Sequence, residues 1–139
     1  MSPDIRARIQ LELSLIDKEI TLLELLMKKS SSAEMDSIDC RAAAACLHSV
    51  YNGYEKIFIM LAKNEGIVIN ADHKWHKNLL DIIGSRLFSQ SLVEDLAKLL
   101  GFRHFFRHAY SFSLKWENME PLIQILIGNV HPKIKDYFR

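Results

Sequence analysis

The chain has 139 residues, of which 49% are hydrophobic and 25% are charged, and its formal net charge at pH 7 is +1. This composition is typical of a single globular domain over residues 1–139 and excludes a disordered chain, and the near-neutral charge excludes indiscriminate binding of nucleic acid by the whole surface. No apolar run is long enough to span a bilayer and the first ten residues do not resemble a signal peptide, so we expect a cytoplasmic protein that does not contact a membrane.

The first predicted helix covers residues 4–29, because apolar residues recur there at steps of three and four. One apolar stripe consists of Ile5, Ile9, Leu13, Ile16, Ile20, Leu23 and Met27. A second stripe consists of Leu11, Leu15, Leu22 and Leu25. A helix that is apolar on two sides packs against more than one neighbour. The second stripe therefore predicts burial inside a bundle, a contact between copies of the chain, or both.

The second predicted helix begins after Asp36 or Ser37, either of which can cap it, and ends at about Asn64. Asp39 lies in its first turn, where a negative charge is favourable. An Asn-Gly pair usually indicates a turn, but the helical period continues through Gly53. We therefore expect one continuous helix in which Gly53 permits close packing or a bend.

Two cysteines, Cys40 and Cys46, lie six residues apart on this second helix. Six residues of helix rise about 9 Å, which exceeds the roughly 7 Å that the Cα atoms of a disulfide can span. We expect both side chains to be reduced, buried and small apolar parts of the core.

Three further helical segments follow along the chain. Gly66 fits a helix stop, and a third helix is expected from Trp75 to Leu87. Ser91 and Glu94 form a capping-box pattern at the start of a fourth helix, and a last helical stretch starts near Asn118. The predicted fold is all-α, an up-and-down bundle of four main helices plus a C-terminal helix.

The positive charge of the chain is concentrated near the end of the fourth helix. Between Leu96 and Trp116 there is no acidic residue, so this segment carries +4 and the rest of the chain −3. The basic side chains of the segment are Lys98, Arg103, His104, Arg107, His108 and Lys115. Arginine binds phosphate oxygens, histidine transfers protons near neutral pH, and the phenylalanines between them can stack on bases. The segment therefore favours phosphate-ester chemistry on RNA, with a solvated basic face as the alternative.

Two histidine pairs have spacings that occur at metal sites, His104 with His108 and His73 with His76. No acidic residue near the first pair completes a site, and Asp72 with the second pair is better explained as the start of the third helix. We therefore predict no metal ion and no other cofactor.

The segment GFRHFFRHAYSF contains Arg103 and His108 in an Arg-x4-His arrangement, followed by Tyr110. With the polar His104 directly after the arginine, this segment resembles the signature of the HEPN superfamily, specifically the HepT-like ribonuclease toxins of type VII toxin–antitoxin pairs. The resemblance covers nearly the whole chain and extends to the all-α bundle. It implies metal-independent cleavage of RNA in the cleft of a homodimer, or of a higher even oligomer, in which two copies of the motif meet.

The resemblance also implies roles for individual residues. Arg103 would bind the scissile phosphate, and His108 would act as general base or acid on the ribose 2′-OH or the leaving oxygen, which gives a 2′,3′-cyclic phosphate. His104 and Arg107 would support the site or bind phosphate. Tyr110 would be the residue to which a nucleotidyltransferase antitoxin attaches adenylate, and the added charge and bulk would block RNA.

Glu55 is a further candidate for a supporting role, from the second helix. It lies between Tyr54 and Lys56, and its default role is an ion pair with a surface lysine or arginine. Alternatively it reaches the cleft and orients Arg103 or His108.

Helix geometry limits how Arg103 and His108 act together. Five residues of ideal helix turn by about 500°, so these two side chains point about 140° apart, whereas Arg103 and Arg107 share a face. Either the helix distorts or ends near His108, or a second chain supplies one member of the pair.

Two other functions are open at this point. The chain could be a catalytically inactive HEPN-like module that binds nucleotide, RNA or a partner protein through the same cleft. It could also be a structural bundle in which the basic cluster is an interface. Binding without turnover would indicate the first, and an Arg103→Ala variant with altered oligomeric state but unaltered ligand affinity would indicate the second.

Overall fold

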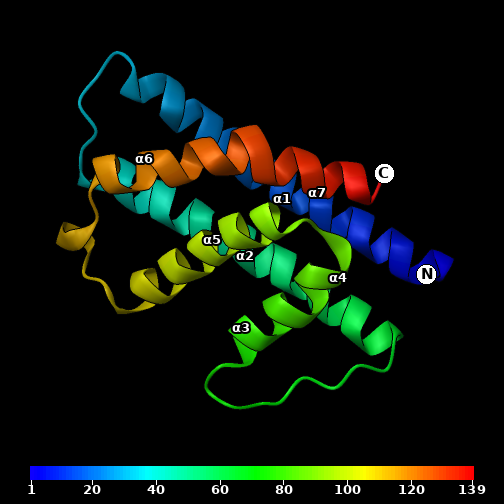
Figure 1. The fold of residues 1–139 in the computed structure, drawn as a ribbon. Helices are drawn as coiled ribbons and strands as arrows, with labels where there is room; N and C mark the ends of the chain where they lie inside the picture. Colours follow the sequence, from blue (N-terminus) through cyan, green and yellow to red (C-terminus); the bar gives the residue numbers. More distant parts are fainter.

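The structure, a computed structural model, describes residues 1–139 except for the side chain of Ser111. The described chain is helical and forms no strand (Figure 1). Its elements are α1 (Pro3–Ser30), α2 (Ser37–Asn64), α3 (Trp75–Leu79), η1 (Leu80–Gly84), α4 (Ser85–Leu87), α5 (Gln90–His108), η2 (Ser111–Ser113), α6 (Trp116–Ile125), η3 (Leu126–Val130) and α7 (His131–Tyr137). The π-helical turns η1 and η3 join the short helices on either side of them. The predicted bundle of four main helices plus a C-terminal helix is therefore confirmed.

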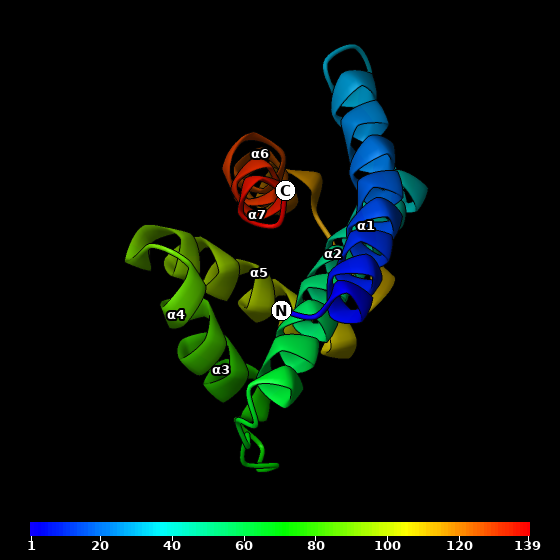
Figure 2. The same cartoon turned by 90° about the vertical axis from the view of Figure 1, so that its right-hand side faces the viewer.

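α2 is the central helix of the bundle. It packs against α1 on one side and α5 on the other (Figure 2). Most of its large apolar side chains are buried, and Tyr51, Tyr54 and Phe58 are among the most completely enclosed in the described chain. Of the described helices, none has the length and the apolar character that crossing a bilayer requires.

A capping box fixes where α2 begins. The backbone N–H of Asp39 donates to Oδ1 of Asp36 at 2.8 Å, and the backbone N–H of Asp36 donates to Oδ2 of Asp39 at 3.1 Å. These two bonds satisfy N–H groups that have no partner inside the helix. Of the two predicted caps, Asp36 is the one that the structure uses.

The predicted capping box of Ser91 and Glu94 at the start of α5 is wrong. The cap is Ser89, whose backbone is extended and whose hydroxyl accepts a hydrogen bond from the backbone N–H of Leu92 at 3.2 Å. The chain leaves α4 through the extended Phe88, so it enters α5 two residues earlier than the pattern indicated. Ser91 consequently lies inside the first turn.

Gly53 allows α1 and α2 to approach closely. A Cβ atom built on Gly53 would lie 2.6 Å from Cγ1 and 2.7 Å from Cδ1 of Ile16 on α1, which is closer than carbon atoms pack. α2 runs through this glycine without interruption. The continuous helix is confirmed, and of the two predicted roles for Gly53 the structure uses close packing.

The two apolar stripes of α1 have different environments. The buried residues of the helix are Ile9, Leu13, Ile16, Ile20 and Leu23, all from the first stripe. The leucines of the second stripe, Leu11, Leu15, Leu22 and Leu25, are between 46% and 62% exposed. Burial of the second stripe inside the bundle is therefore wrong for the described chain, because α2 and the C-terminal helix pack on the other side of α1.

Cys40 and Cys46 are free and buried, as predicted. Burial raises the pKa of the Cys46 thiol to about 12, and a hydrogen bond with Glu19 adds to the shift. A thiol with so high a pKa stays protonated near neutral pH and is a poor nucleophile.

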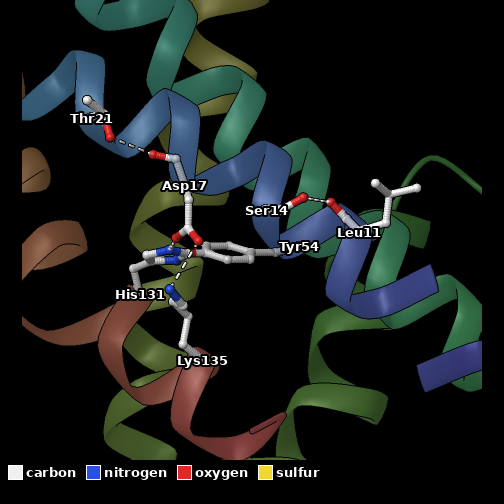
Figure 3. A network of polar contacts seen from close by, with 7 residues as sticks. All are labelled: Leu11, Ser14, Asp17, Thr21, Tyr54, His131 and Lys135. Carbon is white, nitrogen blue, oxygen red and sulfur yellow. Dashed lines mark hydrogen bonds and ion pairs between the residues drawn. The ribbon is translucent and has the colours of Figure 1, made fainter. Parts of the chain in front are cut away.

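A polar network ties the C-terminal helix to α1 and α2 (Figure 3). The buried ring of His131 lies with Nδ1 2.7 Å from the hydroxyl of Tyr54 and with Nε2 2.7 Å from Oδ1 of Asp17. Nζ of Lys135 donates to the other carboxylate oxygen of Asp17 at 3.0 Å. His131 had no predicted role, and in the structure it links three helices.

Candidate active site

The Arg-x4-His segment occupies the last two turns of α5, and the helix ends at His108. The next residue, Ala109, is extended, so the chain turns away from the helix axis directly after the histidine. The end of α5 at His108 does not by itself turn Arg103 and His108 towards one phosphate, because both residues lie within the helix. Arg103 lies within regular helix, so it still points away from the direction of His108.

Arg103 is held against α2 by Asn52. Its Nε donates to Oδ1 of Asn52 at 2.7 Å, and Nδ2 of Asn52 lies 3.4 Å from Nδ1 of His48. Within the described part of the chain, the side chain of Arg103 forms this hydrogen bond to Asn52 and no ion pair. The guanidinium is thus fixed through one nitrogen and keeps its outer two for an anion.

His48, which contacts Asn52, also packs against the ring of Phe106. The two rings have centroids 5.2 Å apart, and the guanidinium of Arg41 lies 4.9 Å from the centroid of Phe106. Burial lowers the pKa of His48, and the positive charges of Arg103 and Arg107 lower it further. Arg103 and Arg107 lie four residues apart within α5, so they lie on one side of that helix.

His104 and His108 form a second pair on α5. Their ring centroids lie 4.9 Å apart in an edge-on arrangement, and both side chains are exposed. The structure therefore brings the two histidines together at the C-terminal end of α5. Arg103 and His108 of one chain project in different directions, since about 140° of helical turn separates them.

Tyr110 lies just past the end of α5 and is 72% exposed. Its ring stacks on that of Phe112, with centroids 5.4 Å apart and planes within 4°. The phenol is therefore accessible to solvent and stands two residues beyond His108.

Glu55 has a different partner from either one predicted. Its side chain is buried, and its Oε2 lies 2.8 Å from Nδ1 of His76 on α3, whose ring stacks on Trp75. Burial raises the pKa of Tyr51 and the charge of Glu55 raises it further, while the charge of Arg103 lowers it. The carboxylate thus acts on the same part of α2 as the arginine does, but its hydrogen bond is to α3.

Asn52, which holds Arg103, and His48 beside it on α2 were not predicted from the sequence. Arg41, His48 and Asn52 follow one another at steps of seven and four, which places them on one face of the helix. A polar line of this kind on an otherwise apolar helix was the available signal. Arg103, the hydrogen-bond partner of Asn52, lies 51 residues further along the sequence, and local patterns do not reveal a contact over that separation.

No three histidine, cysteine, aspartate or glutamate side chains of the described residues gather as ligands for one metal ion. His73 and Asp72 lie in the turn before α3, and Oδ1 of Asp72 accepts a hydrogen bond from the backbone N–H of Lys74 at 2.8 Å. This second histidine pair therefore stands at the start of the third helix, as predicted.

A comparison with known protein families identifies the family of this chain. A family model described as HepT-like protein matches residues 42–139, which include α5 and most of α2. The chain belongs to the HepT-like family of the HEPN superfamily. No curated protein and no solved structure gives a significant match.

Proposed function

We propose that this chain is a metal-independent endoribonuclease that acts in the cytoplasm as the toxin of a toxin–antitoxin pair. The observation that carries the proposal is the state of Arg103, which Asn52 orients through Nε while both Nη atoms are left for an anion. This arginine stands in an Arg-x4-His-x-Tyr segment of a chain from the HepT-like family.

In the proposed reaction, the ribose 2′-oxygen attacks the adjacent phosphorus and the bond from phosphorus to the 5′-oxygen breaks. Arg103 binds the scissile phosphate and stabilises the charge that develops on its oxygens, with Arg107 beside it. His108 accepts the proton of the 2′-hydroxyl or donates one to the leaving 5′-oxygen, and His104 orients it. The products are a 2′,3′-cyclic phosphate and a 5′-hydroxyl.

A second copy of the chain completes the site in this proposal. Because Arg103 and His108 of one chain diverge, a homodimeric cleft brings the arginine of one copy towards the histidine of the other. A further contact is available at the exposed second stripe of α1, which supports assembly into a higher even oligomer.

The antitoxin in this proposal is a nucleotidyltransferase that attaches adenylate to Tyr110. The exposed phenol is accessible to such an enzyme. The added phosphate carries negative charge next to the arginines and histidines and repels RNA. Mass spectrometry of the chain after incubation with ATP and a nucleotidyltransferase encoded by a neighbouring gene tests this step.

Cleavage of a labelled RNA in the presence of EDTA tests the main proposal. We expect Arg103→Ala and His108→Ala to lower the rate at least about 100-fold, because each removes a group that acts on the reacting phosphodiester. Asn52→Ala should lower the rate about tenfold, since it leaves Arg103 in place but frees it to rotate. Lys98→Ala is the matched control, because Lys98 is an exposed cation of the same helix that pairs with Asp95.

Circular dichroism verifies that each variant keeps its helices. Intact RNA after incubation with the unmodified wild-type protein would refute the enzyme. Saturable binding of RNA without cleavage would instead indicate a HEPN-like binding module.

A further inference from the structure

The ring pair of Tyr110 and Phe112 is the most exposed aromatic surface among the described residues. Tyr110 is 72% and Phe112 80% exposed, and their planes are parallel within 4°. Aromatic side chains normally bury most of their surface. Here two neighbouring rings are stacked on each other and still present their outer faces to solvent.

The ionisable side chains that flank the ring pair in the sequence are basic. Arg107 and His108 precede it and Lys115 follows it, and all three side chains are exposed. No acidic residue occurs between Leu96 and Trp116. A ligand that fits this surface therefore combines a flat apolar ring with a negative charge, which is the chemistry of a nucleotide.

The geometry of the pair favours a base that is already unpaired. The two rings contact each other, so a base stacks on an outer face rather than between them. In a duplex each base is covered by its neighbours, whereas in a single strand it can turn out and stack on a protein ring.

We propose that the Tyr110–Phe112 ring pair is a binding site for one unpaired base of single-stranded RNA, next to the scissile phosphate. This base site rests on the proposed function, because that function makes RNA the ligand. The base lies against the ring pair, and the phosphate attached to it lies towards Arg107. The site thereby selects single strands over duplexes.

Binding of a fluorescein-labelled, fully 2′-O-methylated single strand tests this site by anisotropy. Without a 2′-hydroxyl the strand cannot be cleaved, so the measurement is independent of catalysis. We expect Phe112→Leu to weaken binding about tenfold, because leucine is apolar but has no ring to stack on a base. Phe112→Trp should restore the affinity. Tyr137→Leu, a matched change at an exposed ring of α7, should leave it unchanged.

The duplex of the same sequence separates stacking from charge. We expect its weaker binding to be insensitive to Phe112→Leu, since its bases are not available. Unchanged affinity of Phe112→Leu for the single strand, or an equal loss for single strand and duplex, would overturn the site. A change in the molecular mass of the protein without a change in affinity would assign the rings to an interface and also overturn it.

The outcome is distinguishable from that of the proposed function. RNA cleavage with no effect of Phe112→Leu on binding leaves the ribonuclease intact and removes the base site. Ring-dependent binding of single strands by a protein that cleaves no RNA leaves the base site and removes the ribonuclease.

Discussion

At the scale of single residues, the orientation of Arg103 depends on a contact between helices. The position of this arginine and its spacing from His108 along the chain are read directly from the sequence. Its hydrogen bond to Asn52 follows from the packing of α5 on α2. The same packing gives His48 a lowered pKa, so it favours the neutral form of a ring that carries no obvious signal in the sequence.

Glu55 shows the limit of residue-level reasoning. The sequence offered a surface ion pair or a contact with the motif, and the side chain instead meets His76. Both residues belong to segments that were placed correctly along the chain. Their pairing depends on how α3 folds back on α2, which a local pattern does not encode.

Asp17 gives a prediction for the pH dependence of stability. Burial raises its pKa, but the hydrogen bonds from His131 and Lys135 outweigh burial, so the pKa lies below the ordinary value of 3.8. A lowered native pKa stabilises the folded chain above the unfolded pKa, and this contribution is lost as the pH falls through the native value. We expect Asp17→Asn to cost about 1 kcal/mol of unfolding free energy at pH 7, discounted for the exposed part of the carboxylate.

Urea denaturation at pH 7 and pH 3 measures this difference. The gap between Asp17→Asn and wild type should shrink at the lower pH, because the contribution of the carboxylate is lost as the pH falls below the unfolded pKa and towards the lowered native pKa. Glu24→Gln is the control, because Glu24 is an exposed acid of the same helix. A gap that is equally large at both pH values would contradict the assignment.

At the scale of elements, apolar periodicity located the helices because each one buries a single face. The steps of three and four predicted both ends of α1 to within one residue. They also predicted correctly that α2 continues through an Asn-Gly pair. The start of α5 was predicted wrongly, since Ser89 and Ser91 both precede suitable N–H groups. The choice between them depends on the extended backbone at Phe88, which packing sets.

Two glycines in helices provide a matched prediction. Gly53→Ala should lower the free energy of unfolding by about 1–3 kcal/mol, because the new methyl group collides with the buried Ile16. Gly101→Ala should raise it by about 0.5–1 kcal/mol, since a Cβ there meets no atom within 4 Å and alanine favours the helix. Urea denaturation measures both. Equal shifts of the two variants would show that the α1–α2 contact does not limit residue 53.

At the scale of the whole molecule, the second stripe of α1 predicts self-association. Four half-exposed leucines lie on one side of a helix whose other side is buried, and such patches are uncommon on monomers. We expect the wild-type chain to form an even oligomer, and Leu15→Glu combined with Leu22→Glu to halve its molecular mass, because buried carboxylates oppose the contact.

Light scattering coupled to size exclusion measures the mass, with Ile38→Glu as the control. Ile38 is an exposed apolar residue at the start of α2. A monomeric wild type, or a double variant with the wild-type mass, would contradict the role of the stripe. A loss of mass in Ile38→Glu alone would assign the association to the α2 surface instead.

The all-α fold class, the approximate helix boundaries, the unpaired cysteines and the segment from Arg103 to Tyr110 could all be predicted from the amino-acid sequence. Each of these depends on residues that are close along the chain, where helical period and spacing apply. The contacts between helices depend on tertiary packing. Arg103 forms a hydrogen bond with Asn52, and Glu55 forms one with His76. One apolar stripe of α1 remains exposed. These pairings depend on the packing of distant segments, so no local pattern contains them.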